Sequence, residues 1–235
     1  MSEWKAKRFW KKTTVEAVEG GFEIRLDGRP VRTPAKAPLI VPTRALAEVI
    51  EAEWEAQEGE IDPNTMPATR SANAAIDKVA IQHAEVANLL ADYGDSDLLC
   101  YRAAHPRELV ERQAEQWDPL LDWAEEAFGV RLHPRTGIMH VPQEAEALQV
   151  LRAKSHGFNA FELAAFHDLV SLSGSLILGL AVTHGKLSAD EAWMRSRLDE
   201  LYQIEQWGED EEASESAEIK RQSFVHAELF YRLVN

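Results

Sequence analysis

The chain has 235 residues, 45% of them hydrophobic, and a formal net charge of −15. This length and composition predict one large domain or two modest ones with a buried core, and they exclude a disordered acidic protein. The single cysteine, Cys100, excludes an internal disulfide framework and fits a reducing compartment.

The chain shows no sign of a secretory signal or a membrane anchor. Its first residues, MSEWKAKRFWKK, are basic but lack a following apolar segment. The longest uncharged run, 169–185, contains serines, a threonine and a histidine, and it is shorter than the roughly 20 apolar residues of a spanning helix. We therefore expect no membrane association.

Residues 1–42 have the pattern of a small antiparallel β domain. The segments TTVEAV and FEIRL alternate, and Asp27-Gly28 is a typical two-residue hairpin turn before RPVRT. The segment LIV then forms a short last strand between two prolines. We interpret four apolar residues as the core of this domain, with an exposed binding surface as the alternative: Trp4, Trp10, Phe22 and Val31.

Basic and aromatic side chains are interleaved at the start of this domain. They could form a nucleic-acid-binding patch, but residues 51–235 are strongly acidic and would repel phosphate groups. A strand with a solvated face is the interpretation that we favour. The cluster consists of Lys5, Lys7, Arg8, Lys11 and Lys12, with Trp4, Phe9 and Trp10 between them.

From residue 43 the hydrophobic period becomes that of helices. Thr43 is expected to cap a helix that ends near Gly59, and Ser71 to cap the next one. A further helix, 106–128, contains Pro119, which should kink or divide it. The segment DLLCYRA before this helix is ambiguous between a strand and a helical turn.

The second half of the chain continues this helical pattern after one expected β-hairpin near 130–141. The segment SLSGSLILGLAVTHG is apolar on nearly all sides and predicts a central buried helix. Ser188 and Glu191 have the spacing of a capping box for a helix that ends at Trp207. The sequence thus predicts an α+β fold, with a mainly helical domain over 43–235.

The segment EQWGEDEEASESAE, 205–218, contains seven carboxylates and neither lysine nor arginine. It lies between two amphipathic segments, so we interpret it as the first turns of the last helix, where carboxylates interact favourably with the helix dipole. Gly208 is expected to separate the two helices. The run lacks the pattern of a calcium-binding loop, so we expect no dedicated metal site there, and a weak surface cation site stays open as an alternative.

Motifs for cofactor binding or catalysis are absent from the sequence. It has no phosphate-binding loop, dinucleotide fingerprint, nucleophile elbow or zinc-protease motif, so we expect no cofactor and no catalytic residues. His167 and Asp168 could form a base and its orienting acid, but neighbours on a helix should point in different directions. A carboxylate-dependent hydrolase stays open as an alternative, as does a nucleic-acid-binding module that uses the basic N-terminal strand.

Several segments in chain order resemble the family of ATP synthase α-subunit assembly chaperones. The resemblance runs from about Arg8 to Ala217, and its most specific blocks are LDGRPVRTPAK and WGEDEEA. The other blocks are RFWKKTTV, AEWEAQ, DLLCYRA, QWDPLLDWAEEAFGV and SGSLILGLAV.

The resemblance implies a protein without catalysis of its own that binds the unassembled α subunit of the F-type ATP synthase catalytic head. It implies protection of that subunit from aggregation and its release during assembly with β. Two acids around Trp207 match the positions associated with function in the family, and we expect Glu205, Trp207 and Asp210 to bind the partner. No presequence is recognisable, so we expect a bacterial cytoplasmic protein, or one of the mitochondrial matrix after presequence removal.

Overall fold

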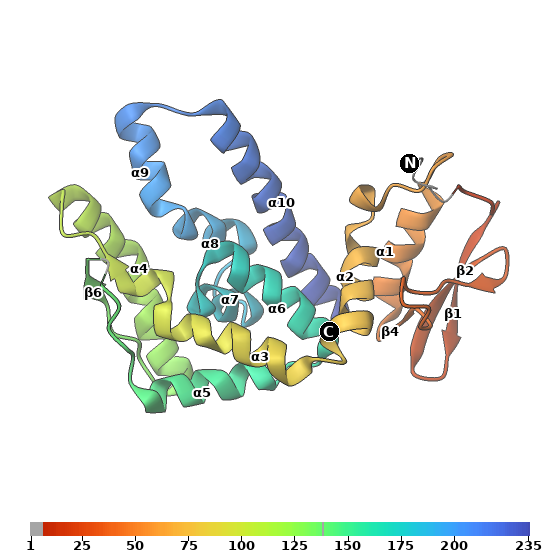
Figure 1. Cartoon of the computed structure of the whole chain (residues 1–235), viewed down its shortest axis with the longest axis horizontal. Coiled ribbons are helices and arrows are strands. Elements are labelled where there is room, and N and C mark those ends of the chain that lie inside the picture. The colour runs from red at the N-terminus through yellow and green to blue at the C-terminus, as the bar shows by residue number, and fades with distance from the viewer. Residues whose placement is uncertain (1–6, 138) are drawn as a thin grey trace. The chain divides into compact units, whose positions relative to one another are not determined.

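The computed structural model describes residues 7–137 and 139–235, and it contains a small antiparallel sheet and a larger set of helices (Figure 1). The α+β fold class is confirmed. The strands are β1 (Thr13–Val18), β2 (Gly21–Leu26), β3 (Arg29–Pro30), β4 (Ile40–Val41), β5 (Tyr101–Arg102) and β6 (Arg135–Thr136). The α-helices are α1 (Arg44–Glu55), α2 (Pro67–Ala74), α3 (His83–Asp92), α4 (Arg107–Phe128), α5 (Ala145–His156), α6 (Ala160–Ser173), α7 (Leu176–Thr183), α8 (Ala189–Ser196), α9 (Leu198–Trp207) and α10 (Glu211–Val234).

The described chain divides into two compact units. The first contains the residues up to His83 together with Ala160–Ala165 and Leu229–Asn235, and the second contains Ala84–Asn159 and Phe166–Glu228. Strands give way to helices just after residue 42, but the unit around the sheet extends beyond that point. A sheet this small cannot bury its apolar face alone, and α1 supplies the cover.

The sheet of the first unit forms as the alternating pattern predicts. β1 pairs antiparallel with β2 in the register Thr13↔Leu26, and β3 and β4 both pair antiparallel with β2. Trp10 and Val31 are buried and Phe22 packs against the same cluster, which confirms their interpretation as core. The remaining residue of that group, Trp4, lies outside the described residues.

The helix expected to begin at Ser71 begins earlier, and that prediction is wrong. α2 begins at Pro67, and a π-helical turn follows it. The carboxylate of Glu53 on α1 accepts the N–H groups of Ala68 (2.7 Å) and Thr69 (2.8 Å), so a residue from another helix caps α2. Ser71 lies inside the helix.

The β-hairpin expected near 130–141 is also wrong for the described residues. Within that range only β6 is a strand, and it pairs in parallel with β5 in the register Tyr101↔Arg135. The segment between β5 and β6 contains α4, which is the kind of long connection that a parallel pair requires. The DLLCYRA segment is a short 3₁₀ helix that leads into β5.

α7 is the buried helix of the second unit, as its apolar sequence predicts, but it is shorter than expected. All residues from Leu176 to Val182 are buried. Gly174 has φ +70°, which ends α6, and Ser175 then caps α7. Gly179 allows a close approach, because a side chain there would lie 2.7 Å from Val170. No helix in the described ranges is long and apolar enough to cross a membrane.

A buried carboxylate fixes the start of α7. Asp97 is fully buried and accepts hydrogen bonds from the Ser175 hydroxyl (2.7 Å) and from the N–H groups of Ile177 (3.0 Å) and Leu99 (3.0 Å). Burial raises the pKa of Asp97 to about 6, and the hydrogen bonds oppose that shift. This acid therefore joins the start of α7 to the segment before β5.

Candidate partner-binding site

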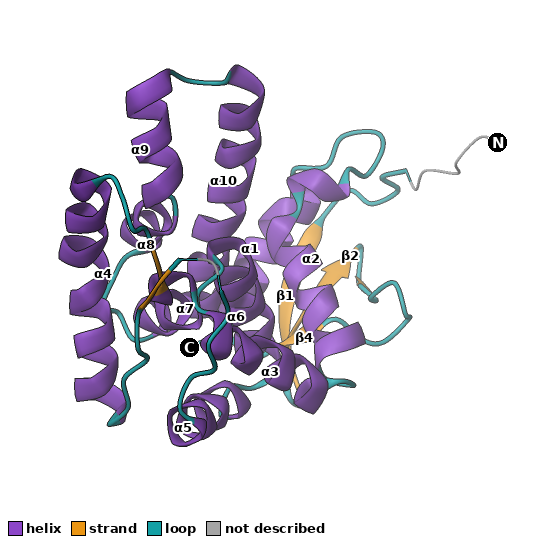
Figure 2. Ribbon diagram, turned by 60° about the vertical axis from the view of Figure 1, so that its left-hand side comes forward, coloured by secondary structure: helices purple, strands orange, loops and turns teal. Residues whose placement is uncertain are grey.

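The corner between α9 and α10 is formed by a glycine and an aspartate. Figures 1 and 2 show the two helices joined by a short loop at their ends, away from α7. Gly208 ends α9 with φ +92°, a conformation that side chains disfavour. The Asp210 carboxylate accepts the N–H of Ala213 (2.9 Å) and its carbonyl accepts the N–H of Ser214 (2.9 Å), so Asp210 caps α10.

The acidic run begins the last helix, as predicted. Glu211 and Glu212 lie in the first turn of α10, where the helix dipole favours negative charge. Glu209, Glu211, Glu212 and Glu215 are exposed. Glu218 is exposed as well, and its carboxylate accepts a hydrogen bond from Arg221 (2.7 Å) that lowers the pKa of Glu218.

Glu205 points toward α4. Its carboxylate contacts the Arg112 guanidinium at 2.7 Å, and Arg112 also contacts Glu108 (3.1 Å) and lies over the Tyr202 ring. The hydrogen bond that Arg112 donates to Glu205 raises the pKa of Arg112. About half of the Glu205 side chain remains exposed.

Trp207 points away from Glu205, since two helical positions are about 200° apart around the axis. Its side chain is 79% exposed. It lines an open groove of about 430 Å³ between α8, α9 and α10, together with Asp210. The structure thus places two of the three predicted partner-binding residues on one groove and the third against α4.

The groove has an apolar floor that the sequence did not reveal as a site. Its apolar lining residues are Trp193, Met194, Leu201, Ile204, Ala213 and Ala217, in addition to Trp207. Leu201 and Ile204 are apolar residues of an amphipathic helix, for which burial is the ordinary expectation. Both are only partly buried, and Met194 is 52% exposed. Incomplete burial is the signal that identifies them, and it is visible only in the structure.

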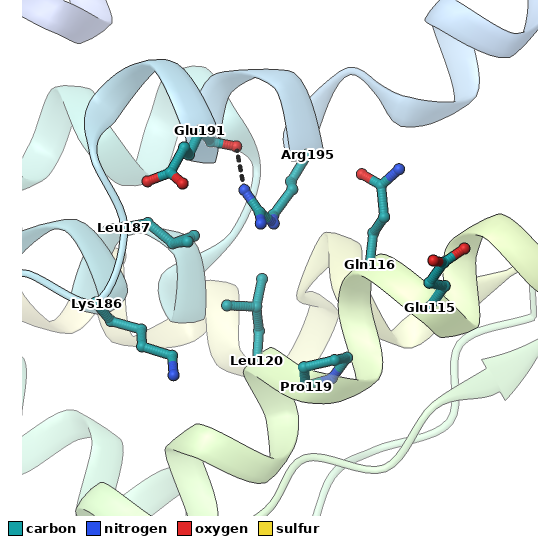
Figure 3. A pocket seen from close by; sticks show the side chains of 8 residues that line it. All are labelled: Glu115, Gln116, Pro119, Leu120, Lys186, Leu187, Glu191 and Arg195. Atoms are coloured by element: carbon teal, nitrogen blue, oxygen red, sulfur yellow. Dashed lines mark hydrogen bonds between the residues drawn. The ribbon is translucent and has the colours of Figure 1, made fainter.

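A second hollow, of about 490 Å³, is relevant to the hydrolase hypothesis (Figure 3). Glu115, Lys186, Glu191 and Arg195 line it between α4 and α8. The Glu191 carboxylate accepts the N–H of Ser188 (2.9 Å) in the predicted capping box, and this bond lowers the pKa of Glu191. A general acid requires a raised pKa, so Glu191 is unsuited to that role. The helix α4, which carries Glu115, is a single helix, so Pro119 does not divide it.

Other candidate catalytic groups do not gather into a site in the described structure. His167 and Asp168 contact each other at 3.0 Å, contrary to the expectation that they point in different directions. Both are almost half exposed. Across residues 7–137 and 139–235, no group of three or more His, Cys, Asp or Glu side chains could hold a metal ion.

The basic N-terminal segment is held against its own unit. Arg8 donates to the Glu55 carboxylate (2.8 Å), and the Asp27 carboxylate accepts the N–H groups of Lys11 (3.1 Å) and Lys12 (3.0 Å). These contacts hold the basic segment in place as part of the unit that contains the sheet. Lys5 lies outside the described residues.

Comparisons with known proteins agree with the resemblance read from the sequence. The family model described as ATP12 chaperone protein matches residues 7–125. The mitochondrial protein atp12 of Schizosaccharomyces pombe is 30% identical over 221 residues, which cover 89% of this chain and 76% of that protein.

Solved structures match over nearly the whole chain. Atp12 from Paracoccus denitrificans is 50% identical with a TM-score of 0.96, covering 99% of this chain and 100% of that one. An aspartate-to-lysine variant of the same protein gives the same identity and TM-score, with 100% of both chains covered. A candidate chaperone from Agrobacterium tumefaciens is 44% identical with a TM-score of 0.92, over 97% of this chain and 86% of that one.

Proposed function

The chain belongs to the ATP12 chaperone family, a family of ATP synthase assembly chaperones, and on this premise we propose that it binds the unassembled α subunit of the catalytic head. Binding prevents aggregation of α by covering the surface that β later covers, and α is released during assembly with β. The observation that carries this proposal is the family match together with the fold shared over almost the whole chain.

The proposed activity is binding without catalysis. The resemblance implies a holding chaperone, and such a protein must recognise an apolar surface while staying dispersed itself. A net charge of −15 makes free copies of the protein repel one another and so keeps them dispersed, and the exposed Trp207 ring offers an apolar contact. We expect it to act in the bacterial cytoplasm or the mitochondrial matrix, where the catalytic head is assembled.

Glu205, Trp207 and Asp210 are the residues that we propose to contact the α subunit. Trp is a residue type that often dominates the binding free energy of interfaces. Carboxylates at the rim of an interface orient a basic partner and raise the rate of association. Each of the two acids also has a local structural role, so a test must separate recognition from stability.

Co-purification tests the proposal as a whole. The chain and the F-type ATP synthase α subunit are produced together without β, and the complex is isolated and mapped by crosslinking. We expect a soluble complex, less light scattering from α than in its absence, and release of α when β is added. Failure to form a complex, with unchanged scattering, would show that the proposal is wrong.

Charge reversal at Glu205 tests this acid separately. We expect Glu205→Lys to weaken the complex with α by about tenfold or more, because like charges then meet at the rim. The circular dichroism spectrum should remain unchanged. Arg112→Met is the matched control, since it removes the same ion pair but keeps the Glu205 charge. Equal weakening by both variants would assign Glu205 a structural role only.

A further inference from the structure

The groove between α8, α9 and α10 is open and partly apolar. Trp207 and Met194 are 79% and 52% exposed on it, and Leu201 and Ile204 form part of its floor. Covering such side chains removes apolar surface from water, which favours binding. Its volume of about 430 Å³ is that of a site for a few side chains and not for a whole domain.

The charges around the groove are unevenly compensated. At one end, Arg197 contacts Glu200 (3.2 Å) and Arg221 contacts Glu218 (2.7 Å). At the loop end, Glu209 and Asp210 line the groove, are exposed and form no ion pair within the described residues. The groove therefore joins an apolar floor to an uncompensated negative rim.

We infer that this groove binds a short segment of the unassembled α subunit that presents an apolar side chain next to lysine or arginine. The apolar side chain contacts Trp207, Met194 and Ile204, and the cationic groups face Glu209 and Asp210. This inference rests on the proposed function and adds the chemistry of the bound segment. It also extends the recognition surface to residues outside the 205–210 motif.

Charge complementarity selects this occupant over a second copy of the chain. Two copies that met at this groove would bring their acidic rims together, and their net charges of −15 would oppose the approach. A basic segment is attracted by the same rim, and an acidic segment is rejected. The rim thus supplies specificity, while the floor supplies the apolar contact.

A pair of exposed methionine and isoleucine variants tests the groove. Met194→Lys places a cation on the floor, and Ile219→Lys makes the same charge change on α10 at a residue that is 61% exposed and does not line the groove. Because both side chains are exposed, both variants should keep the wild-type circular dichroism spectrum and Tm. We expect Met194→Lys to raise the Kd for isolated α subunit about tenfold, and Ile219→Lys to change it less than about twofold.

Peptides that tile the α subunit identify the segment itself. We expect binding by peptides with an apolar residue beside lysine or arginine, weakening as NaCl rises, and loss of binding when these cations are changed to glutamate. Binding should shift the tryptophan fluorescence of the wild type more than that of Trp207→Phe, in which the buried Trp193 is the remaining tryptophan of the groove.

The outcomes separate this inference from the proposed function. If the wild type binds α and both lysine variants bind it equally, the groove is not the site, although the chaperone proposal stands. Selective binding of acidic peptides overturns the inference as well. A dimer of the chain alone that Met194→Lys dissociates would assign the groove to a second copy. If the wild type binds no α, the proposed function itself is wrong.

Discussion

Asp97 and Asp210 both precede helices of the second unit, yet the two regions use their carboxylates in opposite ways. Asp97 is buried, and three donors from two segments bind it. Asp210 is exposed and caps α10 through the N–H of Ala213. Burying a carboxylate costs free energy unless hydrogen bonds compensate it, so the Asp97 carboxylate has a structural role. An exposed carboxylate can cap a helix and keep its charge available to a partner.

Removal of the Asp97 carboxylate should have the largest effect on stability. In Asp97→Ala the Ser175 hydroxyl and the N–H groups of Ile177 and Leu99 lose their acceptor in the interior. Each buried donor without a partner costs about 1 to 3 kcal/mol, so we expect a loss of about 4 kcal/mol in the free energy of unfolding. Urea unfolding at about pH 5 measures this loss, and a loss below about 1 kcal/mol would contradict the structural role of Asp97.

The pH dependence of stability sharpens the same comparison. The pKa of Asp97 is about 6 in the folded chain, above its ordinary value of 3.8, so the folded state binds this proton more tightly than the unfolded state. The contribution of Asp97 to the free energy of unfolding should therefore fall by about 3 kcal/mol as pH rises from about 4 to about 6, and stay constant above that.

Urea unfolding of the wild type and of Asp97→Asn across this range measures that contribution. The wild type should lose stability relative to the variant as pH rises. Parallel curves would show that the carboxylate does not titrate in this window.

Substitutions of Asp210 should have the smallest effect on stability and a clear effect on binding. Asp210→Ala removes the cap and should cost about 1 kcal/mol, while Asp210→Asn keeps a capping oxygen and should cost only a few tenths. Thermal unfolding distinguishes the two variants. If the charge recognises the α subunit, both should weaken the complex, whereas weakening by the alanine variant alone would point to helix capping as the whole role.

Local patterns predicted several elements because short-range chemistry decides them. The alternation of TTVEAV and FEIRL with the Asp27-Gly28 turn predicted β1 to β3, since a half-buried sheet requires that period. Thr43 caps α1, and Ser188 with Glu191 forms the capping box of α8. These signals depend on residues within one turn of each other, so a single sequence shows them.

Contacts between distant residues decided the elements that were predicted wrongly. α2 begins at Pro67 because Glu53 from another helix binds its first N–H groups. β6 pairs with β5, more than 30 residues earlier, in place of the expected hairpin. Such partners leave no periodic signal near the element that they stabilise.

The sequence by itself determined the family resemblance and the α+β class, because both follow from residue types in a fixed order. Through that resemblance it also named Glu205, Trp207 and Asp210 as candidates. The tertiary structure alone decided that Trp207 and Asp210 line one groove while Glu205 contacts Arg112. It also left Met194 and its neighbours incompletely covered. Whether an apolar residue of a helix is buried in a core or lines a groove depends on which helices pack beside it. That packing is decided by contacts between residues far apart in the chain.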